Sequence, residues 1–388
     1  MKAGKKLTEG FEKEIERCIR CGFCQAVCPV YETTFRPALN ARGRMLLLKE
    51  VMEGTVPLSQ ELAVPFYECT TCQACTHSCP ARVKVVEVVE GARRKLYEEG
   101  LTPGSLLAVR DNILKTGNVY ASSQEERTEI YPPILKEKAR EGKLKAKAET
   151  VLFMGCVPSY SDMKIVPGLL KPLEAAEVDY TMLAAEEICC GFPLYLMGSD
   201  EFEAHAAGVI AKIKAVGAKE LVTPCAGCCK TFKELYPKMG DLQVKVSHSV
   251  QYLDKLIREG KIKLTREITG TATYHDPCDL GRALGIFEEP RHILQRVPGL
   301  KVVEMTRNRL LARCCGGGGG MQACNPEMAR GMGAQRVRDA LAVGADLIVS
   351  GCAACKDNLR KGALTIPRKE RGKMRFMDIT EIVANAMD

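Results

Sequence analysis

The sequence lacks tryptophan, and only 5% of its 388 residues are aromatic. It also lacks any run of 18 apolar residues, so we expect that the chain itself does not span a membrane. The segment from Met1 to Phe11 is polar and rich in lysine, unlike a secretory signal peptide. No G-x-G-x-x-G follows an expected strand, and neither G-x-S-x-G nor H-E-x-x-H occurs. We therefore expect no flavin and no NAD on this chain.

Cysteine, in contrast, is abundant: the chain has 20, and 18 of them fall into two kinds of repeated pattern. So many thiols predict a reducing, cytoplasmic environment. The first kind of pattern is C-x2-C-x2-C-x3-C-P, and it occurs twice near the N-terminus. Its members are Cys18, Cys21, Cys24 and Cys28 before Pro29, and Cys69, Cys72, Cys75 and Cys79 before Pro80.

The spacing of this first pattern is typical of the ligands of [4Fe–4S] cubes. Three sulfurs at every third residue wrap one cube, whereas the cysteine before proline points away and serves the other cube in two-cluster ferredoxins. A disulfide framework suits short secreted chains, and zinc explains C-x2-C pairs but not two complete runs closed by proline. We therefore expect two cubes with exchanged fourth ligands. The expected sets are Cys18, Cys21, Cys24 with Cys79, and Cys69, Cys72, Cys75 with Cys28.

The second kind of pattern has five cysteines, two of them adjacent, and it also occurs twice. The first copy is Cys156, Cys189, Cys190, Cys225 and Cys228, and the second is Cys278, Cys314, Cys315, Cys352 and Cys355. The segments 216–228 and 343–355 align without a gap at an offset of 127 residues. The chain therefore contains an internal duplication, with units of about 120 residues.

Short β-rich runs alternate with helical patterns in these units, which predicts small parallel sheets covered by helices. In the first unit the expected strands are 151–154, 180–183 and 220–223, and the expected helices are 169–176 and 203–216. Cys156, Cys225, Cys278 and Cys352 follow expected strand ends, where ligands of parallel sheets gather. We therefore expect one cysteine site in each unit.

The expected fold class is α+β and multidomain: an all-helical two-cluster ferredoxin domain, followed by two duplicated α/β domains with small parallel sheets. Helical periodicity at 44–52 and 83–99 supports the first part. The expected domains are 1–100 for the ferredoxin part, 101–149 for a charged connector with some helix, 150–265 for the first unit and 266–388 for the second.

The net charge of +8 is unevenly distributed. Residues 136–147 contribute six positive and two negative charges, and residues 361–375 contribute six positive and one negative. Such runs are solvated faces in most proteins. The alternative is a docking surface for an acidic electron carrier or an anionic membrane leaflet.

The duplicated five-cysteine pattern resembles the CCG domain of heterodisulfide reductases. Two ferredoxin motifs followed by two CCG domains resemble the D-type subunit of heterodisulfide reductases. They also resemble the iron–sulfur subunits of glycolate oxidase, lactate utilisation systems and anaerobic glycerol-3-phosphate dehydrogenase. The resemblance extends from Cys18 to about Lys361, and the 34-residue spacer between Cys190 and Cys225 is one residue shorter than the usual pattern.

The resemblance implies that each five-cysteine set binds a non-cubane [4Fe–4S] cluster, giving one or two such clusters besides the cubes. In the reductase branch, a disulfide substrate lies between the two clusters and is split in one-electron steps. In the glycolate oxidase branch, several of these cysteines are often missing and the domains act as relay or docking units. Both sets are complete here, which favours an enzyme of the heterodisulfide reductase type. The alternative is an electron relay from an FAD-linked glycolate, lactate or glycerol-3-phosphate dehydrogenase toward quinone.

Either function implies partner subunits in a redox complex: an FAD-linked dehydrogenase, a cytochrome b-like membrane subunit or a bifurcating flavoprotein. We expect no nucleic-acid partner. We also expect a cytoplasmic chain that reaches the cytoplasmic membrane face only through a partner.

Several residues near the cysteines are further candidates. The five-glycine run 316–320 lets backbone N–H groups approach and donate to cluster sulfides; a phosphate-binding loop is the alternative, but no Lys-Ser/Thr follows it. His275 either protonates a product thiolate, as a catalytic residue, or is a structural histidine bonded to Asp276. The remaining expectations are that His248 lies in a helix cap or just behind the ligands, that His77 tunes a cube, and that Cys229 and Cys324 are buried thiols.

Overall fold

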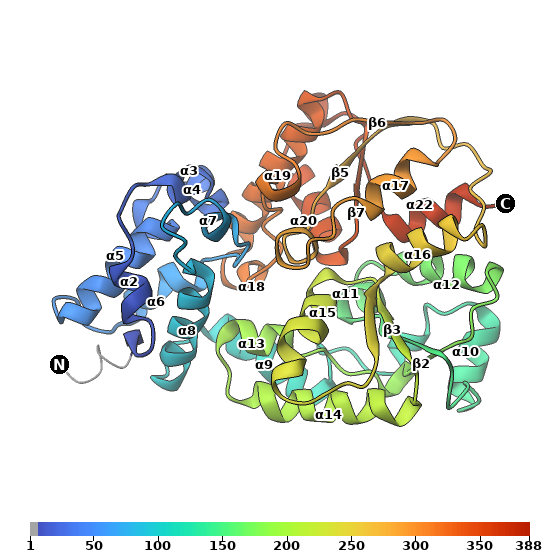
Figure 1. The fold of residues 1–388 in the computed structure, drawn as a ribbon, viewed down its shortest axis with the longest axis horizontal. Coiled ribbons are helices and arrows are strands. Elements are labelled where there is room, and N and C mark those ends of the chain that lie inside the picture. The colour runs from blue at the N-terminus through green and yellow to red at the C-terminus, as the bar shows by residue number, and fades with distance from the viewer. Residues whose placement is uncertain (1–6) are drawn as a thin grey trace.

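The N-terminal part of the molecule is entirely helical. The computed structural model describes residues 7–388, and its first part lies at one end of the molecule (Figure 1). Its helices are α2 (Glu12–Glu16), α3 (Phe23–Ala26), α4 (Pro29–Thr34), η1 (Pro37–Leu39), α5 (Ala41–Glu53), α6 (Gln60–Tyr67), α7 (Ala74–His77) and α8 (Val85–Glu98). The expected helices 44–52 and 83–99 are thus α5 and α8.

Local sequence explains where these helices begin and end. The Asn40 side chain accepts a hydrogen bond from Gly43 N at the start of α5, and Gly54 ends it in the left-handed conformation. Pro29 opens α4 at the first helical turn, where its missing N–H costs nothing. The apolar faces of α5, α6 and α8 bury Leu48 and Phe66, among others, and each such side chain contributes about 1.5–3 kcal/mol.

The segment between the ferredoxin part and the first sheet contains α9 (Gly104–Thr116), η2 (Glu126–Thr128) and α10 (Pro133–Arg140). It includes the basic run 136–147, in which several charges are paired at the surface. Lys136 and Arg140 both contact Glu129, and Lys145 contacts Asp179. In this run the solvated-face interpretation fits the structure.

The rest of the chain forms two α/β units, each with a four-stranded parallel sheet. The sheet orders are β2-β1-β3-β4 and β6-β5-β7-β8, the same order in both halves. In the central strand pairs, Val151 lies opposite Leu221 in one sheet and Thr273 lies opposite Ile348 in the other. The fold class predicted from the sequence is therefore confirmed.

The first unit is built from the following elements: β1 (Thr150–Leu152), α11 (Cys156–Tyr160), α12 (Ile165–Ala175), β2 (Tyr180–Met182), η3 (Ala184–Glu186), α13 (Phe192–Met197), α14 (Glu201–Val216), β3 (Glu220–Thr223), α15 (Ala226–Lys230), η4 (Thr231–Leu235), η5 (Tyr236–Lys238), β4 (Lys245–His248) and α16 (Ser249–Arg258). The three strands expected here are β1, β2 and β3, each within two residues of its expected bounds.

The second unit repeats this order of strands, again with two helices after its cysteine pair. Its elements are β5 (Gly270–His275), η6 (Asp279–Ala283), α17 (Glu289–Gln295), β6 (Leu300–Val302), η7 (Arg309–Leu311), α18 (Met321–Cys324), α19 (Pro326–Ala342), β7 (Leu347–Ser350), α20 (Ala353–Ala363), α21 (Arg368–Arg371), β8 (Arg375–Asp378) and α22 (Ile379–Ala386).

The two units pack against each other through equivalent helices, as the right-hand part of Figure 1 shows. Helix α12 of the first unit contacts α22 of the second, and α16 of the first contacts α17 of the second. Because α12 corresponds to α17 and α16 to α22 in the duplicated order, the interface is pseudo-symmetric. Buried ion pairs cross it twice: Lys230 lies 3.4 Å from Asp279, and Lys356 lies 2.9 Å from Asp162. Among the helices of residues 7–388, none is long and apolar enough to cross a membrane.

Candidate functional site

The ferredoxin-type cysteines gather around the short helices α3 and α7. Each helix follows a residue in the left-handed conformation, Gly22 at φ 89° and Gln73 at φ 63°. These sharp turns fold the chain back so that consecutive cysteines of one run lie on one side of a tight loop.

The structure brings the eight cysteines together in the interleaved sets expected from the sequence. Burial, and then the neighbouring thiolates of Cys18, Cys21 and Cys79, raise the pKa of Cys24 to about 11. Burial and the thiolates of Cys72, Cys69 and Cys28 likewise raise the pKa of Cys75 well above its ordinary value. The proline-terminated cysteine of each run is thus a neighbour of the other run's sulfurs. We call these groups the first ferredoxin site (Cys18, Cys21, Cys24, Cys79) and the second ferredoxin site (Cys28, Cys69, Cys72, Cys75).

Because the pKa values of Cys24 and Cys75 are raised, these sulfurs stay protonated at neutral pH unless a cation among them favours the thiolate form. An iron–sulfur cube supplies that charge, so the donor sets fit the cofactor expected from the sequence. That these cysteines are the ligands stays a prediction.

The five cysteines of the first unit form a connected group at the carboxyl ends of its strands. Cys156 follows β1, Cys225 follows β3, and the pair Cys189 and Cys190 precedes α13. Hydrogen-bonding neighbours link their side chains in the order Cys156, Cys189, Cys190, Cys228 and Cys225. The thiols of Cys189 and Cys228 lower the pKa of Cys190 to about 6. We call these five residues the first CCG site.

The second unit repeats this arrangement, which we call the second CCG site. Its side chains are linked in the order Cys278, Cys314, Cys315, Cys355 and Cys352, and the sulfurs of Cys315 and Cys355 are 3.2 Å apart. The structure thus assembles both five-cysteine sets that the sequence predicts. Their role as cluster ligands also stays a prediction.

His275 belongs to the second CCG site. Its ring nitrogen and the sulfurs of Cys315 and Cys355 lie within 4.8 Å of one another. The expected bond to Asp276 is wrong: His275 Nδ1 accepts from Arg336 Nε at 3.1 Å, and Asp276 instead pairs with Arg291. Since the arginine can only donate to Nδ1, a neutral His275 carries its proton on Nε2. This N–H, which has no other partner within residues 7–388, is available to the cysteine sulfurs.

The two CCG sites face each other across one cavity. The side chains of Cys225 and Cys352 are hydrogen-bonding neighbours, so the sites are nearly in contact. A cavity of about 380 Å³ is lined by cysteines of both sites and by apolar side chains. Leu106 and Val109 of α9 contribute to its wall, as does the polar Lys361. The sequence did not predict that the connector helix α9 would line this cavity, because its polar composition pointed to a surface role.

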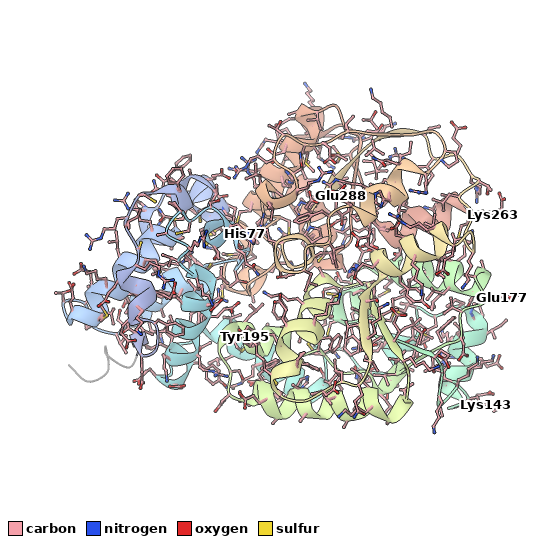
Figure 2. All side chains as sticks on the ribbon, viewed as in Figure 1. His77, Lys143, Glu177, Tyr195, Lys263 and Glu288 are labelled. Carbon is pink, nitrogen blue, oxygen red and sulfur yellow. The ribbon has the colours of Figure 1, made fainter. Side chains whose placement is uncertain are left out.

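The second ferredoxin site lies directly beside the second CCG site. The Cys314 thiol donates to Cys72 and lowers the pKa of Cys72 to about 5. Arg282 Nε donates to the carbonyl oxygen of Cys72 at 2.6 Å. His77 lies at the same junction (Figure 2), and its Nε2 is 3.2 Å from the Arg282 carbonyl oxygen. His77 therefore joins the ferredoxin part to the second unit, and its expected tuning of a cube stays a prediction.

The glycine run brings the backbone close to sulfur and to the ferredoxin loop. Gly316 N donates to the sulfur of Cys314 at 3.4 Å, and Gly317 N donates to that of Cys315 at 3.3 Å. A Cβ at Gly319 would lie 2.3 Å from the Cys69 carbonyl oxygen, so only glycine fits this junction. The run thus donates to cysteine sulfurs, and the expected donation to cluster sulfides stays a prediction.

The remaining candidates have structural positions. His248 is the N-cap of α16 and accepts from Val250 N, as a cap-region residue would. Cys229 is fully buried, and burial raises its pKa to about 12. Cys324 is only half-buried, which corrects the expectation of a buried thiol.

Sequence reasoning missed the buried arginines, among them the three beside the ferredoxin cysteines: Arg44, Arg93 and Arg282. A signal was present for two of them. Arg44 lies on the apolar stripe of α5, and Arg93 lies on that of α8. A charged residue on an otherwise buried face needs a partner, and that need could have marked both positions.

Comparisons with known proteins agree with this architecture. Residues 14–83 match the family described as 4Fe-4S dicluster domain, and residues 150–233 and 272–360 match the family described as Cysteine-rich domain. The chain is 34% identical to the D-type subunit of the dihydromethanophenazine:CoB–CoM heterodisulfide reductase of Methanosarcina barkeri, over 99% of this chain and 96% of that one.

More distant relatives are longer proteins. The chain is 26% identical to the EtfAB:quinone oxidoreductase of Syntrophomonas wolfei, over 97% of this chain and 58% of that protein. It is 29% identical to the probable iron-sulfur-binding oxidoreductase FadF of Bacillus subtilis, over 83% of this chain and 46% of that protein. A crystal structure of a hypothetical protein from Helicobacter pylori shares the fold, with a TM-score of 0.59 at 12% identity over 100% of this chain and 76% of that one.

Together, the matched domains and relatives identify an iron–sulfur oxidoreductase subunit that works with partner subunits.

Proposed function

Because the chain belongs to the family of D-type heterodisulfide reductase subunits, we propose that it is the disulfide-reducing subunit of a redox complex. The reaction is R–S–S–R′ + 2 e⁻ + 2 H⁺ → R–SH + R′–SH. The S–S bond breaks, a partner subunit supplies the two electrons, and water supplies the two protons.

The observation that carries this proposal is the cavity between the two complete CCG sites. It is bounded by cysteines of both sites, by apolar side chains and by the polar residues Asp279, Gln322 and Lys361. Two one-electron sites flanking an S–S bond suit a substrate whose two sulfurs separate. The apolar wall of α9 and α13 excludes water from that bond, and Lys361, which is paired with Asp357, is a cation of the lining that an anionic substrate end could approach.

The clusters supply one-electron transfer when bound. The chain's own residues arrange the path. Cys21 is exposed at the first ferredoxin site, which makes that site accessible to an electron-donating partner. The contact between Cys72 and Cys314 joins the second ferredoxin site to the second CCG site. His275 offers its Nε2 proton to the sulfurs of the second CCG site, where negative charge accumulates.

This electron path, which begins at the exposed first ferredoxin site, indicates where a partner subunit would bind. A flavoprotein or a cytochrome b-like membrane subunit that presents its redox centre at the first ferredoxin site would complete the complex. We propose that the chain is cytoplasmic and meets the membrane through that partner.

A cavity-filling variant tests the proposal. Val109→Phe places a ring in the cavity from α9, whereas Leu114→Phe on the same helix changes an exposed position and serves as the matched control. Anaerobically purified chain, reduced by dithionite, would be mixed with the CoB–CoM heterodisulfide named for the relatives and with the neutral probe bis(2-hydroxyethyl) disulfide. We expect thiol release and a substrate-dependent EPR signal in the parent and in Leu114→Phe, and the loss of both in Val109→Phe at unchanged iron content.

The second candidate function is an electron relay from an FAD-linked dehydrogenase toward quinone. The similarity to FadF and to EtfAB:quinone oxidoreductase favours it. In that case neither disulfide is reduced by the parent chain, and Val109→Phe transfers electrons to a soluble quinone as fast as the parent.

A further inference from the structure

Three arginines converge on the second ferredoxin site from three different segments. Arg44 comes from α5, Arg93 from α8 and Arg282 from η6. Their residues are 1%, 0% and 6% exposed, so their guanidinium groups are removed from water. Desolvation of a permanent cation is strongly unfavourable unless an anion compensates for it.

Arg44 holds the start of the second cysteine run. Its Nη2 donates to the carbonyl oxygen of Glu68 at 2.6 Å, directly before Cys69, and its Nε donates to that of Pro65. The negative charges of the Cys69, Cys28 and Cys75 sulfurs stabilise the positive charge of this guanidinium. The guanidinium is therefore near enough to three of the four sulfurs of the site for their charges to interact.

Arg93 ties the same run to both CCG units. It donates to carbonyl oxygens of the ferredoxin part, including Cys69 at 2.6 Å. It also donates to the carbonyl oxygens of Leu196 in the first unit and Gly319 in the second. These partners are backbone carbonyl groups, which satisfy its N–H groups, while its charge also acts on the half-buried Glu90 without forming an ion pair.

Arg282 stands between the second ferredoxin site and the second CCG site. Its Nε donates to the carbonyl oxygen of Cys72, and its Nη1 donates to those of Leu310 and Ala312. Its Nη2 is buried and has no partner among residues 7–388. The sulfurs of Cys72, Cys278 and Cys314 are near enough to stabilise the positive charge of Arg282. Sulfur is therefore the available acceptor for this N–H group.

None of the three arginines forms an ion pair with a carboxylate in the part of the chain that the structure describes. For Arg44 and Arg282 the neighbouring anions are the thiolates of the second ferredoxin site, whereas the charge of Arg93 also acts on Glu90. The first ferredoxin site differs, because the arginines that line its cavity are Arg20, which is exposed, and Arg42, which is half-buried. Water screens the charge of Arg20, and Arg42 is less removed from water than the three arginines of the second site, although its Nε is buried.

We propose that Arg44, Arg93 and Arg282 are positioning residues that hold the reduction potential of the second ferredoxin site above that of the first. This rests on the proposed function, because it requires a cube at each site. Reduction adds one negative charge to a cube, and nearby desolvated cations stabilise the reduced form. Electrons that enter at the exposed first site therefore favour the second, next to Cys314.

The test is an EPR-monitored redox titration of the anaerobically purified full chain. We expect two cube signals with separate midpoint potentials, and Cys28→Ala identifies the signal of the second site by removing it. Arg282→Gln should weaken reduction of that cube about tenfold, a shift of about 59 mV to lower potential for one electron, and leave the first cube unchanged. Arg282→Lys should restore most of the shift, and Arg44→Gln should act in the same direction if Arg282→Gln does not fold.

The exposed neighbour Arg94, which contacts Glu203 at the surface, provides the matched control, since Arg94→Gln should shift neither signal. Equal potentials for the two cubes, or equal shifts of both in Arg282→Gln, would overturn the inference. An iron content too low for two cubes would instead overturn the proposed function on which it rests.

Discussion

Where the second CCG unit carries His275 beside its cysteines, the duplicated position of the first unit carries Phe153. Phe153 packs edge-to-face on Phe232 at 4.8 Å, whereas His275 bonds to Arg336 and faces two sulfurs. The glycine run after Cys315 corresponds to Phe192 and its apolar neighbours after Cys190. The duplication thus keeps the sulfurs and the sheet, while one site is apolar and the other polar. We infer that the two sites are not functionally equivalent.

The two units also fix their first cysteine by different ion pairs. In the first unit, Glu187 accepts from Met154 N and Gly155 N, and it is paired with Arg127 from the connector. In the second unit, Asp276 is paired with Arg291, which also binds Glu304. The first site therefore depends on a residue outside its own unit, and the second does not.

The largest expected effect comes from breaking the ion pair between Arg127 and Glu187, on which the first unit depends. Arg127 and Glu187 are both fully buried, so Arg127→Met leaves a buried, unpaired carboxylate. We expect a loss of about 3–5 kcal/mol in the free energy of unfolding, measured by anaerobic denaturant titration. Arg140→Met, in an exposed pair with Glu129, is the control and should cost less than about 1 kcal/mol. Equal losses in both variants would show that the buried pair does not anchor the first unit.

The second prediction compares electron transfer into the two CCG sites, which differ in their contact with the second ferredoxin site. Cys314 contacts Cys72, and the corresponding Cys189 has no ferredoxin cysteine among the residues that act on its pKa. Cys314→Ala should slow electron transfer into the CCG sites by about 100-fold, and Cys189→Ala should leave transfer into the second site intact. Stopped-flow absorbance after dithionite addition measures both rates. If Cys189→Ala slows the second site as strongly, electrons enter through both units.

A third change makes the second site resemble the first. His275→Phe removes the N–H that faces Cys315 and Cys355, and it leaves Arg336 Nε without its partner. We expect disulfide reduction to fall about tenfold, with an altered EPR signal of the second site. Phe153→Leu in the first unit is the matched control and should change neither. An unchanged EPR signal in His275→Phe would place the histidine outside the chemistry of the second site.

The smallest effect concerns the equivalent helix caps His248 and Asp378, which both begin a capping box. Burial lowers the pKa of His248 to about 3, below its ordinary value near 6.5. The neutral form is therefore favoured in the folded state, and its stabilisation is present above pH 6.5 and is lost as the pH falls. Between pH 7 and 5.5 this loss is about 1 kcal/mol. His248→Asn, which keeps a cap acceptor, should flatten that pH dependence in denaturant titrations; an unchanged slope would contradict it.

Much of the architecture could be predicted from the sequence, because cysteine spacing and the internal repeat are local patterns. The parallel sheets and the interleaved cysteine groups follow from such patterns. The charged residues could not be predicted in the same way. Arg282 lies four residues after Cys278, but its contact with Cys72 joins parts of the chain about 210 residues apart. The hydrogen bond expected between His275 and Asp276 was also wrong. Asp276 is adjacent in the sequence, whereas the observed partner, Arg336, comes from the distant helix α19.

The iron content per chain tests the central claim most directly, because that claim is that both CCG sites hold clusters in addition to the two cubes. Anaerobically purified chain would be analysed for iron and acid-labile sulfide against a protein concentration from amino-acid analysis. Two cubes and two four-iron clusters predict about sixteen irons, and one CCG cluster predicts about twelve. A value of about eight, with a normal EPR signature of two cubes, would mean that the CCG sites are empty and would contradict the disulfide-reducing function.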